Sequence, residues 1–177
     1  MTVTFQNHTK VRTCSISDVP ALEKVAHLTL LETFSSQVAS EKLLSYSKNH
    51  FSSQQLCKEI QRSSVRFYAV VSHAKTVAYM KVNAGVSREE KPVPDGLEIE
   101  CLYVLKDFQN KQIGRALVEE AVSYAKALGL KRVWLSVWEK NPTALTFYKK
   151  MGFSESKTIT CTCENTKLTK HLLILDV

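Results

Sequence analysis

The 177-residue chain lacks any apolar run that approaches the roughly twenty residues needed to cross a bilayer. Its N-terminal residues 1–10 are polar and lack the apolar segment of a secretory signal peptide. We therefore expect a cytoplasmic protein with no membrane partner. The sequence also lacks internal repeats and low-complexity segments, so its length predicts one domain, residues 1–177, with a substantial core.

Metal-binding spacings and basic clusters are missing as well. The five cysteines are an odd number, have no metal-binding spacing with the histidines, and predict free thiols without a metal ion (Cys14, Cys57, Cys101, Cys161 and Cys163). The net charge is +7, but Lys and Arg are scattered, and no basic run has aromatic residues between its members. We therefore expect no nucleic-acid partner, and the basic surface instead suits a ligand with several phosphate groups.

The sequence does contain a regular succession of strand and helix patterns. Period-two apolar patterns predict strands at 11–16, 66–71, 77–82, 97–104, 133–137, 155–162 and 168–175. Helical patterns start at Ser17–Pro20 with a capping side chain and an early proline, after Ser40, after Ser52, at Ile113 and at Pro142. These elements predict an α/β layered domain with a mixed, mostly antiparallel central sheet and helices on both faces.

The strand at 97–104 is followed by a short loop and then by the helix that opens at Ile113. The first turn of a helix presents backbone N–H groups without intrahelical partners, and the helix dipole adds partial positive charge. Both features suit a pyrophosphate group. Taken alone, however, such a junction is more often an ordinary connection between a strand and a helix.

A second motif further along the chain changes this interpretation. Asn141 is followed by Phe147-Tyr148-Lys149-Lys150-Met151-Gly152-Phe153, which matches an Asn…Phe-Tyr-x-x-x-Gly-Phe signature. The segment from Gln109 to Ala116 matches the acyl-CoA loop Gln/Arg-x-x-Gly-x-Gly/Ala. On these motifs the chain resembles the GNAT N-acetyltransferases. One difference is that Gln112 stands at the first glycine position of the loop, so this peptide lacks the conformational freedom of glycine.

Four segments resemble one group within that superfamily, the bacterial PaiA-type spermidine/spermine N-acetyltransferases: Leu31–Phe34, Leu97–Glu100, Val137–Asn141 and Phe147–Phe153. This resemblance implies the GNAT fold and acetyl-CoA-dependent acetylation of a small primary amine such as spermidine or spermine. A homodimer is compatible with it, and the sequence does not determine the oligomeric state. A cationic polyamine requires a locally acidic site on this basic protein.

The resemblance also implies where acetyl-CoA would bind. The backbone of 102–104 would pair with the pantetheine arm and hold the thioester carbonyl, and the loop would bind the pyrophosphate. Asn141 and Tyr148 are seven residues apart and can share one stripe of a helix. The expected acetyl-CoA contacts are Leu102, Tyr103, Val104, Gln109, Asn110, Lys111, Gln112, Ile113, Gly114, Arg115, Ala116, Asn141 and Tyr148.

Acetyl transfer to an amine needs a base, because primary amines have a pKa of about 10 and are mostly protonated at neutral pH. Glu98 and Glu100 are two residues apart on a strand and project from the same face. Both positions carry carboxylates in some GNAT enzymes, and the Glu100 position resembles the one used by spermidine/spermine acetyltransferases, so the resemblance implies that these are the catalytic carboxylates. By resemblance, Glu32 and Phe34 join them as acceptor contacts, and Tyr148 would protonate the departing thiolate. The alternative interpretations are solvated carboxylates and a core aromatic.

Two other functions compete with the polyamine acetyltransferase. A protein or peptide N-acetyltransferase of the same fold is one, although the ribosomal-protein acetylating relatives have a catalytic glutamate where this chain has Ser136. A non-catalytic acyl-CoA-binding module is the other. The loss of Tyr148 or of both strand carboxylates would indicate that module, and this sequence retains all of these residues.

Overall fold

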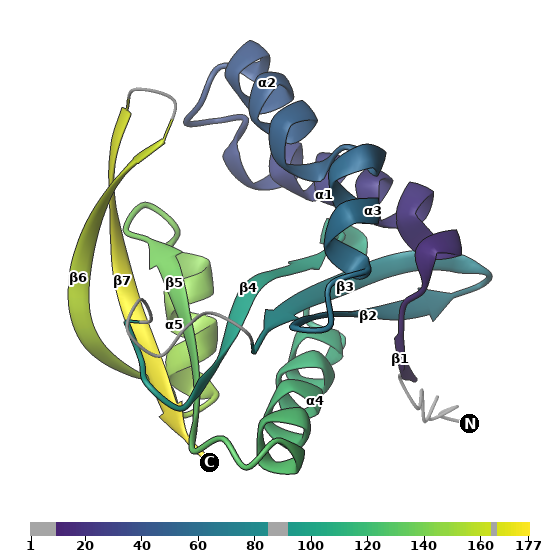
Figure 1. Cartoon of the computed structure of the whole chain (residues 1–177). Coiled ribbons are helices and arrows are strands. Elements are labelled where there is room, and N and C mark those ends of the chain that lie inside the picture. Colours follow the sequence, from purple (N-terminus) through teal and green to yellow (C-terminus); the bar gives the residue numbers. More distant parts are fainter. Residues whose placement is uncertain (1–9, 85–91, 164–165) are drawn as a thin grey trace, which may run out of the picture. The chain divides into compact units, whose positions relative to one another are not determined.

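The structure of the chain is a computed structural model, which describes residues 10–84, 92–163 and 166–177 (Figure 1). The described chain forms two compact units. One contains the residues up to Met80 with Leu102–Val118, and the other contains the described residues of Lys81–Cys101 with Glu119–Val177. In chain order the elements are β1 (Val11–Thr13), η1 (Ile16–Asp18), α1 (Val19–Phe34), α2 (Ser40–Phe51), α3 (Ser53–Ile60), β2 (Val65–Ser72), β3 (Lys75–Asn83), β4 (Gly96–Val104), η2 (Lys106–Phe108), α4 (Ile113–Ala127), β5 (Arg132–Trp138), α5 (Pro142–Lys150), β6 (Ser154–Cys163) and β7 (Thr166–Asp176).

The strands are hydrogen-bonded in the order β1-β2-β3-β4-β5-β7-β6. β4 and β5 are parallel, whereas β1 with β2, β5 with β7, and β6 with β7 are antiparallel. The predicted fold class, α/β with a mixed and mostly antiparallel sheet, is therefore confirmed. Within the part of the chain that is described, no helix has the length and apolar character needed to span a membrane.

In the first unit, α1, α2 and α3 pack on one another around buried apolar side chains (Figure 1). These side chains include Leu22, Val25, Leu43 and Leu56. The strands predicted at 66–71 and 77–82 are present as β2 and β3, which the turn at His73 and Ala74 joins. Its turn residues His73 and Ala74 have φ of 48° and 60°, the left-handed values that a two-residue hairpin turn of the primed type requires.

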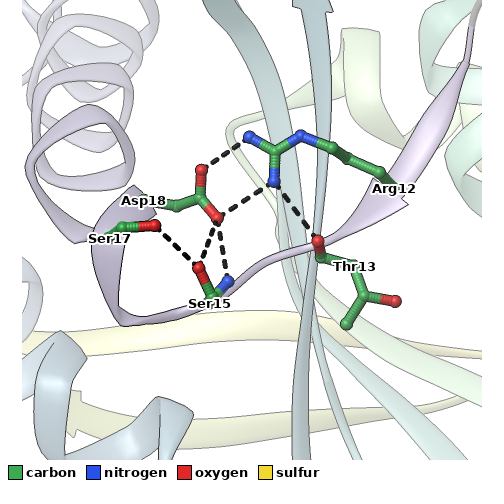
Figure 2. Close-up of polar contacts among 5 residues, drawn as sticks. All are labelled: Arg12, Thr13, Ser15, Ser17 and Asp18. Carbon is green, nitrogen blue, oxygen red and sulfur yellow. Dashed lines mark hydrogen bonds and ion pairs between the residues drawn. The ribbon is translucent and has the colours of Figure 1, made fainter.

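The first strand is shorter than the sequence predicts, because a polar cluster ends it at Thr13 and starts η1 (Figure 2). The Asp18 carboxylate accepts hydrogen bonds from Ser15 N at 2.8 Å and from Arg12 Nη1 at 3.0 Å. The prediction that a Ser17 or Asp18 side chain would cap α1 is wrong, since Asp18 occupies the N-cap position and makes no side-chain cap hydrogen bond to that helix. Its carboxylate instead accepts hydrogen bonds from Arg12 and Ser15.

The second unit contains β5, β7 and β6 in antiparallel order, with the first part of β4 paired to β5. Leu97, Leu135, Leu172 and Leu173 are almost fully buried and form part of its core. Gly96 opens β4 at a point of close approach, because a Cβ there would lie 2.7 Å from Trp134 Cδ1. A glycine is therefore required for steric reasons, although its φ is ordinary.

Candidate active site

The loop between β4 and α4 contains Gln112, which stands at a glycine position of the acyl-CoA loop motif. Gln112 has φ of 63° and Asn110 has φ of 59°, so both adopt the left-handed conformation. Gln112 accordingly takes a backbone conformation that favours glycine. Ala116 N donates to Gln112 O at 3.0 Å, which makes this the first turn of α4. The backbone N–H groups at the start of a helix are the part of it that suits an anion.

Three basic residues lie before and after the start of α4 in the sequence. Lys106, Lys111 and Arg115 are exposed, and Lys111 Nζ lies 5.1 Å from the centroid of the Phe108 ring. Gln109 Nε2 donates to Val104 O at 3.1 Å and so ties the loop to the end of β4. Helix N–H groups, the helix dipole and three cations together fit the pyrophosphate of a coenzyme A ligand.

Glu32, an expected acceptor contact, lies close to the same loop. Its Oε2 accepts a hydrogen bond from Lys106 N at 3.0 Å, so it caps the first turn of η2. Phe34 is the last residue of α1 and is half-buried. The first helix is therefore fixed to the segment that follows β4, and the Glu32 carboxylate already holds a backbone amide in this arrangement.

β4 separates from β5 partway along its length. Among the described residues, the parallel register joins Gly96–Glu98 to Arg132–Trp134 and ends there, whereas β5 continues to Trp138 in register with β7. A strand edge that leaves its neighbour can hydrogen-bond an extended ligand through its main chain. The separation begins at Glu98, one of the two expected catalytic carboxylates.

The two carboxylates of β4 differ in their surroundings. Glu98 is half-buried, whereas the Glu100 side chain is 43% exposed. Lys81 Nζ of β3 donates to Glu100 Oε1 at 2.7 Å, and the Lys81 side chain is only 8% exposed. The sequence analysis did not identify Lys81. The available signal was a single lysine inside the otherwise apolar run from Val77 to Val82.

Tyr148 is buried on α5, with its ring 5.0 Å from Phe147 and 5.5 Å from Phe153 between centroids. Burial raises the pKa of Tyr148 well above its ordinary value, and the negative charge that Cys101 of β4 can carry raises it further. The phenol is therefore neutral at physiological pH and retains its proton. A buried neutral phenol can donate a hydrogen bond to an anion formed beside it.

Asn141 is the N-cap of α5. Its Oδ1 accepts from Ala144 N at 3.1 Å, and Pro142 follows it in the first turn. The side-chain oxygen is thus used to start the helix. The amide nitrogen of Asn141 is a donor that this cap does not use.

The expected site residues fall into two groups. The loop, Leu102–Val104 and Glu32 belong to the first unit, while Glu98, Glu100, Asn141 and Tyr148 belong to the second. Tyr103 has aromatic neighbours in its own unit, with ring centroids 5.7 Å from Phe51 and 5.4 Å from Tyr79. β4 runs through both groups, so it connects the expected base to the expected pantetheine contacts along one strand.

Comparison with known proteins gives relatives that are N-acetyltransferases. An uncharacterized N-acetyltransferase of Lactobacillus delbrueckii subsp. lactis is 28% identical over 145 residues, covering 82% of this chain and 84% of that protein. The spermidine N(1)-acetyltransferase of Thermoplasma acidophilum is 25% identical over 153 residues, covering 84% and 90%. The crystal structure of the Thermoplasma acidophilum PaiA N-acetyltransferase with coenzyme A superposes with a TM-score of 0.80 at 22% identity, covering 95% and 98% of the two chains.

The family model of the acetyltransferase (GNAT) family matches residues 30–153. This range contains both motifs, the strand carboxylates and Glu32. The assignment supports an enzyme over a non-catalytic acyl-CoA-binding module. The chain belongs to the acetyltransferase (GNAT) family and is an N-acetyltransferase.

Proposed function

We propose that this enzyme transfers an acetyl group from acetyl-CoA to a primary amine of a polyamine, such as spermidine or spermine. The observation that carries the proposal is the position of Glu98 and Glu100 on one strand, where β4 separates from β5. Similarity to a spermidine N(1)-acetyltransferase over 84% of the chain supports the same acceptor class. The protein is proposed to act as one domain of residues 1–177.

Acetyl-CoA is proposed to bind through main-chain groups. The N–H groups at the start of α4 would hold the pyrophosphate, assisted by Lys111 and Arg115. The backbone of Leu102–Val104 would pair with the pantetheine arm and orient the thioester carbonyl. The left-handed Gln112 fits this role, because it gives the loop the same backbone shape as a glycine.

The reaction requires two proton movements. Glu100 accepts a proton from the ammonium form of the acceptor, directly or through water, and the free amine nitrogen then attacks the thioester carbonyl carbon. The carbon–sulfur bond then breaks, and the nitrogen loses its second proton, which passes to the departing thiolate directly or through water. Tyr148 donates a hydrogen bond to the sulfur as negative charge develops on it. The raised pKa of Tyr148 lies above the value of about 8.5 typical of a thiol, so complete proton transfer from the phenol is uphill.

The acceptor site is proposed to be locally acidic although the chain has a net charge of +7. Lys81 pairs with Glu100, one of the two β4 carboxylates. A carboxylate can accept several hydrogen bonds, so Glu100 can bind an ammonium group while Oε1 remains bonded to Lys81.

Release of coenzyme A can be measured with spermidine, spermine and a neutral-chain monoamine at increasing ionic strength. We expect the KM for spermidine and spermine to rise with salt more steeply than the KM for the monoamine, because exposed charges are screened beyond about 10 Å at 0.1 M salt. Equal salt dependence for all three amines would show that the acceptor site does not attract polyamines through its charge.

A further inference from the structure

Lys81 is a buried lysine whose charge faces one of the proposed catalytic groups. It is 6% exposed and lies on β3 next to Met80 and Val82, which have no exposed surface. Removing an ammonium group from water is unfavourable unless a counter-charge compensates it. Glu100 supplies such a counter-charge, and its Oε1 lies 2.7 Å from Lys81 Nζ.

The two partners of this ion pair are unequally exposed. The Lys81 side chain is 8% exposed and the Glu100 side chain 43%. The cation is thus the buried, fixed end of the pair, and the carboxylate is the end that solvent and ligands can reach. An exposed carboxylate would otherwise sample several rotamers, and a short bond to a buried partner restricts it.

Stability alone does not explain a lysine at this position. Well-packed apolar side chains often replace a buried ion pair without loss of stability, so burial of Lys81 does not by itself account for a charged residue there. The ion pair does what an apolar residue could not, which is to hold the Glu100 carboxylate in one orientation.

We propose that Lys81 is a positioning residue for acetyl transfer, an inference that rests on the proposed function of Glu100 as the base. Lys81 bonds Oε1 and orients the carboxylate so that its remaining lone pairs can take the proton from the acceptor ammonium. Lys81 itself neither binds the acceptor nor moves a proton. Loss of a fixed orientation affects the reaction rate more than the binding of acetyl-CoA.

Lys81→Met tests this directly, because methionine keeps the length and apolar stem of lysine but removes its charge. We expect kcat to fall about 10- to 100-fold, while the KM for acetyl-CoA changes by less than about threefold. Lys75→Met is the matched control, since Lys75 is exposed at the start of the same strand, and it should leave both constants unchanged. Circular dichroism and the melting temperature report whether each variant folds.

A double-mutant cycle with Glu100→Gln separates positioning from a structural role. The glutamine oxygen can still accept from Lys81, so Glu100→Gln should fold and lose most of its kcat. If Lys81 acts through Glu100, then adding Lys81→Met to Glu100→Gln should change kcat by less than about twofold. A structural effect of Lys81 would instead lower kcat by the same factor in both backgrounds and would overturn the proposal.

The remaining outcomes are also decisive when the cycle uses whichever primary amine the enzyme acetylates fastest. A normal kcat in Lys81→Met, with a low kcat in Glu100→Gln, would reject the positioning role and leave the function of Glu100 intact. A normal kcat in Glu100→Gln would reject Glu100 as the base and the role of Lys81 with it. If Lys81→Met does not fold, Lys81→Gln replaces it, because its amide can donate to Glu100 but carries no charge.

Discussion

Gln112 adopts a backbone conformation that favours glycine, with φ of 63°. A Cβ in the left-handed region costs about 1–2 kcal/mol, and Gln112→Gly removes this strain. Glycine is more flexible in the unfolded chain, so its larger loss of entropy on folding cancels part of the stabilisation. We therefore expect Gln112→Gly to raise the free energy of unfolding by about 0.5–1 kcal/mol, measured by urea denaturation.

Gln61→Gly is the matched control for this substitution. Gln61 has φ of −84° at the end of α3, an ordinary helical value, so glycine relieves no strain there and should lower stability or leave it unchanged. A loss of stability in Gln112→Gly of the same size as in Gln61→Gly would show that the loop does not hold residue 112 in the left-handed conformation.

Tyr148 is the proposed hydrogen-bond donor to the departing thiolate, and burial raises the pKa of its phenol. Tyr148→Phe keeps the ring but removes the hydroxyl, so we expect kcat to fall about 10²- to 10⁴-fold while the KM for acetyl-CoA changes by only a few fold. Because the phenol stays protonated through the physiological range, the fold-reduction should be the same from pH 6 to pH 9, measured as CoA release.

Tyr124→Phe provides the comparison for Tyr148→Phe. Tyr124 lies on α4, outside the candidate site residues, and its substitution should change kcat by less than about twofold. If Tyr148→Phe also retained nearly normal kcat, Tyr148 would be a core aromatic and another group would protonate the thiolate.

Single residues of the site were predictable when their role depends on local sequence. The left-handed position of residue 112 is the position that the loop motif assigns to glycine. Two contacts were not predictable, because they join distant segments: Lys81 with Glu100, and Glu32 with Lys106 N, which is 74 residues away. Such contacts depend on strand register and helix placement, which the packing of the whole unit determines.

Most helices and strands were predictable from the periodicity of apolar residues. Where a predicted boundary was wrong, the cause lies in local hydrogen bonds. Gly129 follows α4 with φ of 69°, and Leu130 N donates to Ala125 O at 2.9 Å, which is the pattern of a glycine C-cap. β1 was predicted three residues too long, because apolar alternation continues to Ile16 while the hydrogen bonds of Asp18 fold the chain into η1.

The Arg12–Asp18 pair that starts η1 should make stability depend on pH. The Arg12 guanidinium, with a hydrogen bond from Ser15 N, lowers the pKa of Asp18 from 3.8 to about 2. A carboxyl group with a depressed pKa in the folded state stabilises the protein above its unfolded pKa, and this contribution is lost as pH falls from about 4 to about 2. The Arg12 side chain is 41% exposed, so solvent screens part of the interaction.

We therefore expect Asp18→Asn to lower the free energy of unfolding by about 1 kcal/mol at pH 7, less than the full pKa shift implies. The difference from the wild type should shrink as pH falls through 4 and vanish near 2, in denaturation followed by circular dichroism. Asp107→Asn, at an exposed position in η2, should show no such pH dependence. A stability difference in Asp18→Asn that is constant across this range would contradict the ion pair.

At the scale of the whole molecule, the fold class was predictable but the strand order was not. Neighbouring strands in a hairpin, such as β2 and β3, are identified by a short turn between them. The insertion of β7 between β5 and β6 is a long-range pairing, which periodicity does not specify. The end of the β4–β5 register at Glu98 is equally a property of the assembled sheet.

The net charge of +7 and a polycationic acceptor appear incompatible only when charge is averaged over the surface. Lys106, Lys111 and Arg115 follow the end of β4 and are proposed to face phosphate groups, whereas Glu98 and Glu100 lie within β4 itself. Separation of basic and acidic groups along the chain allows one basic protein to bind an anionic co-substrate and a cationic acceptor.

A competition experiment directly tests whether the enzyme prefers a polyamine as its acceptor. The wild-type enzyme is given acetyl-CoA with equal millimolar concentrations of spermidine and of a peptide with a free N-terminal alanine, and the products are identified by mass spectrometry. We expect acetylspermidine to form in large excess over acetylated peptide. Formation of acetylated peptide without acetylspermidine would contradict it and would identify a peptide N-acetyltransferase.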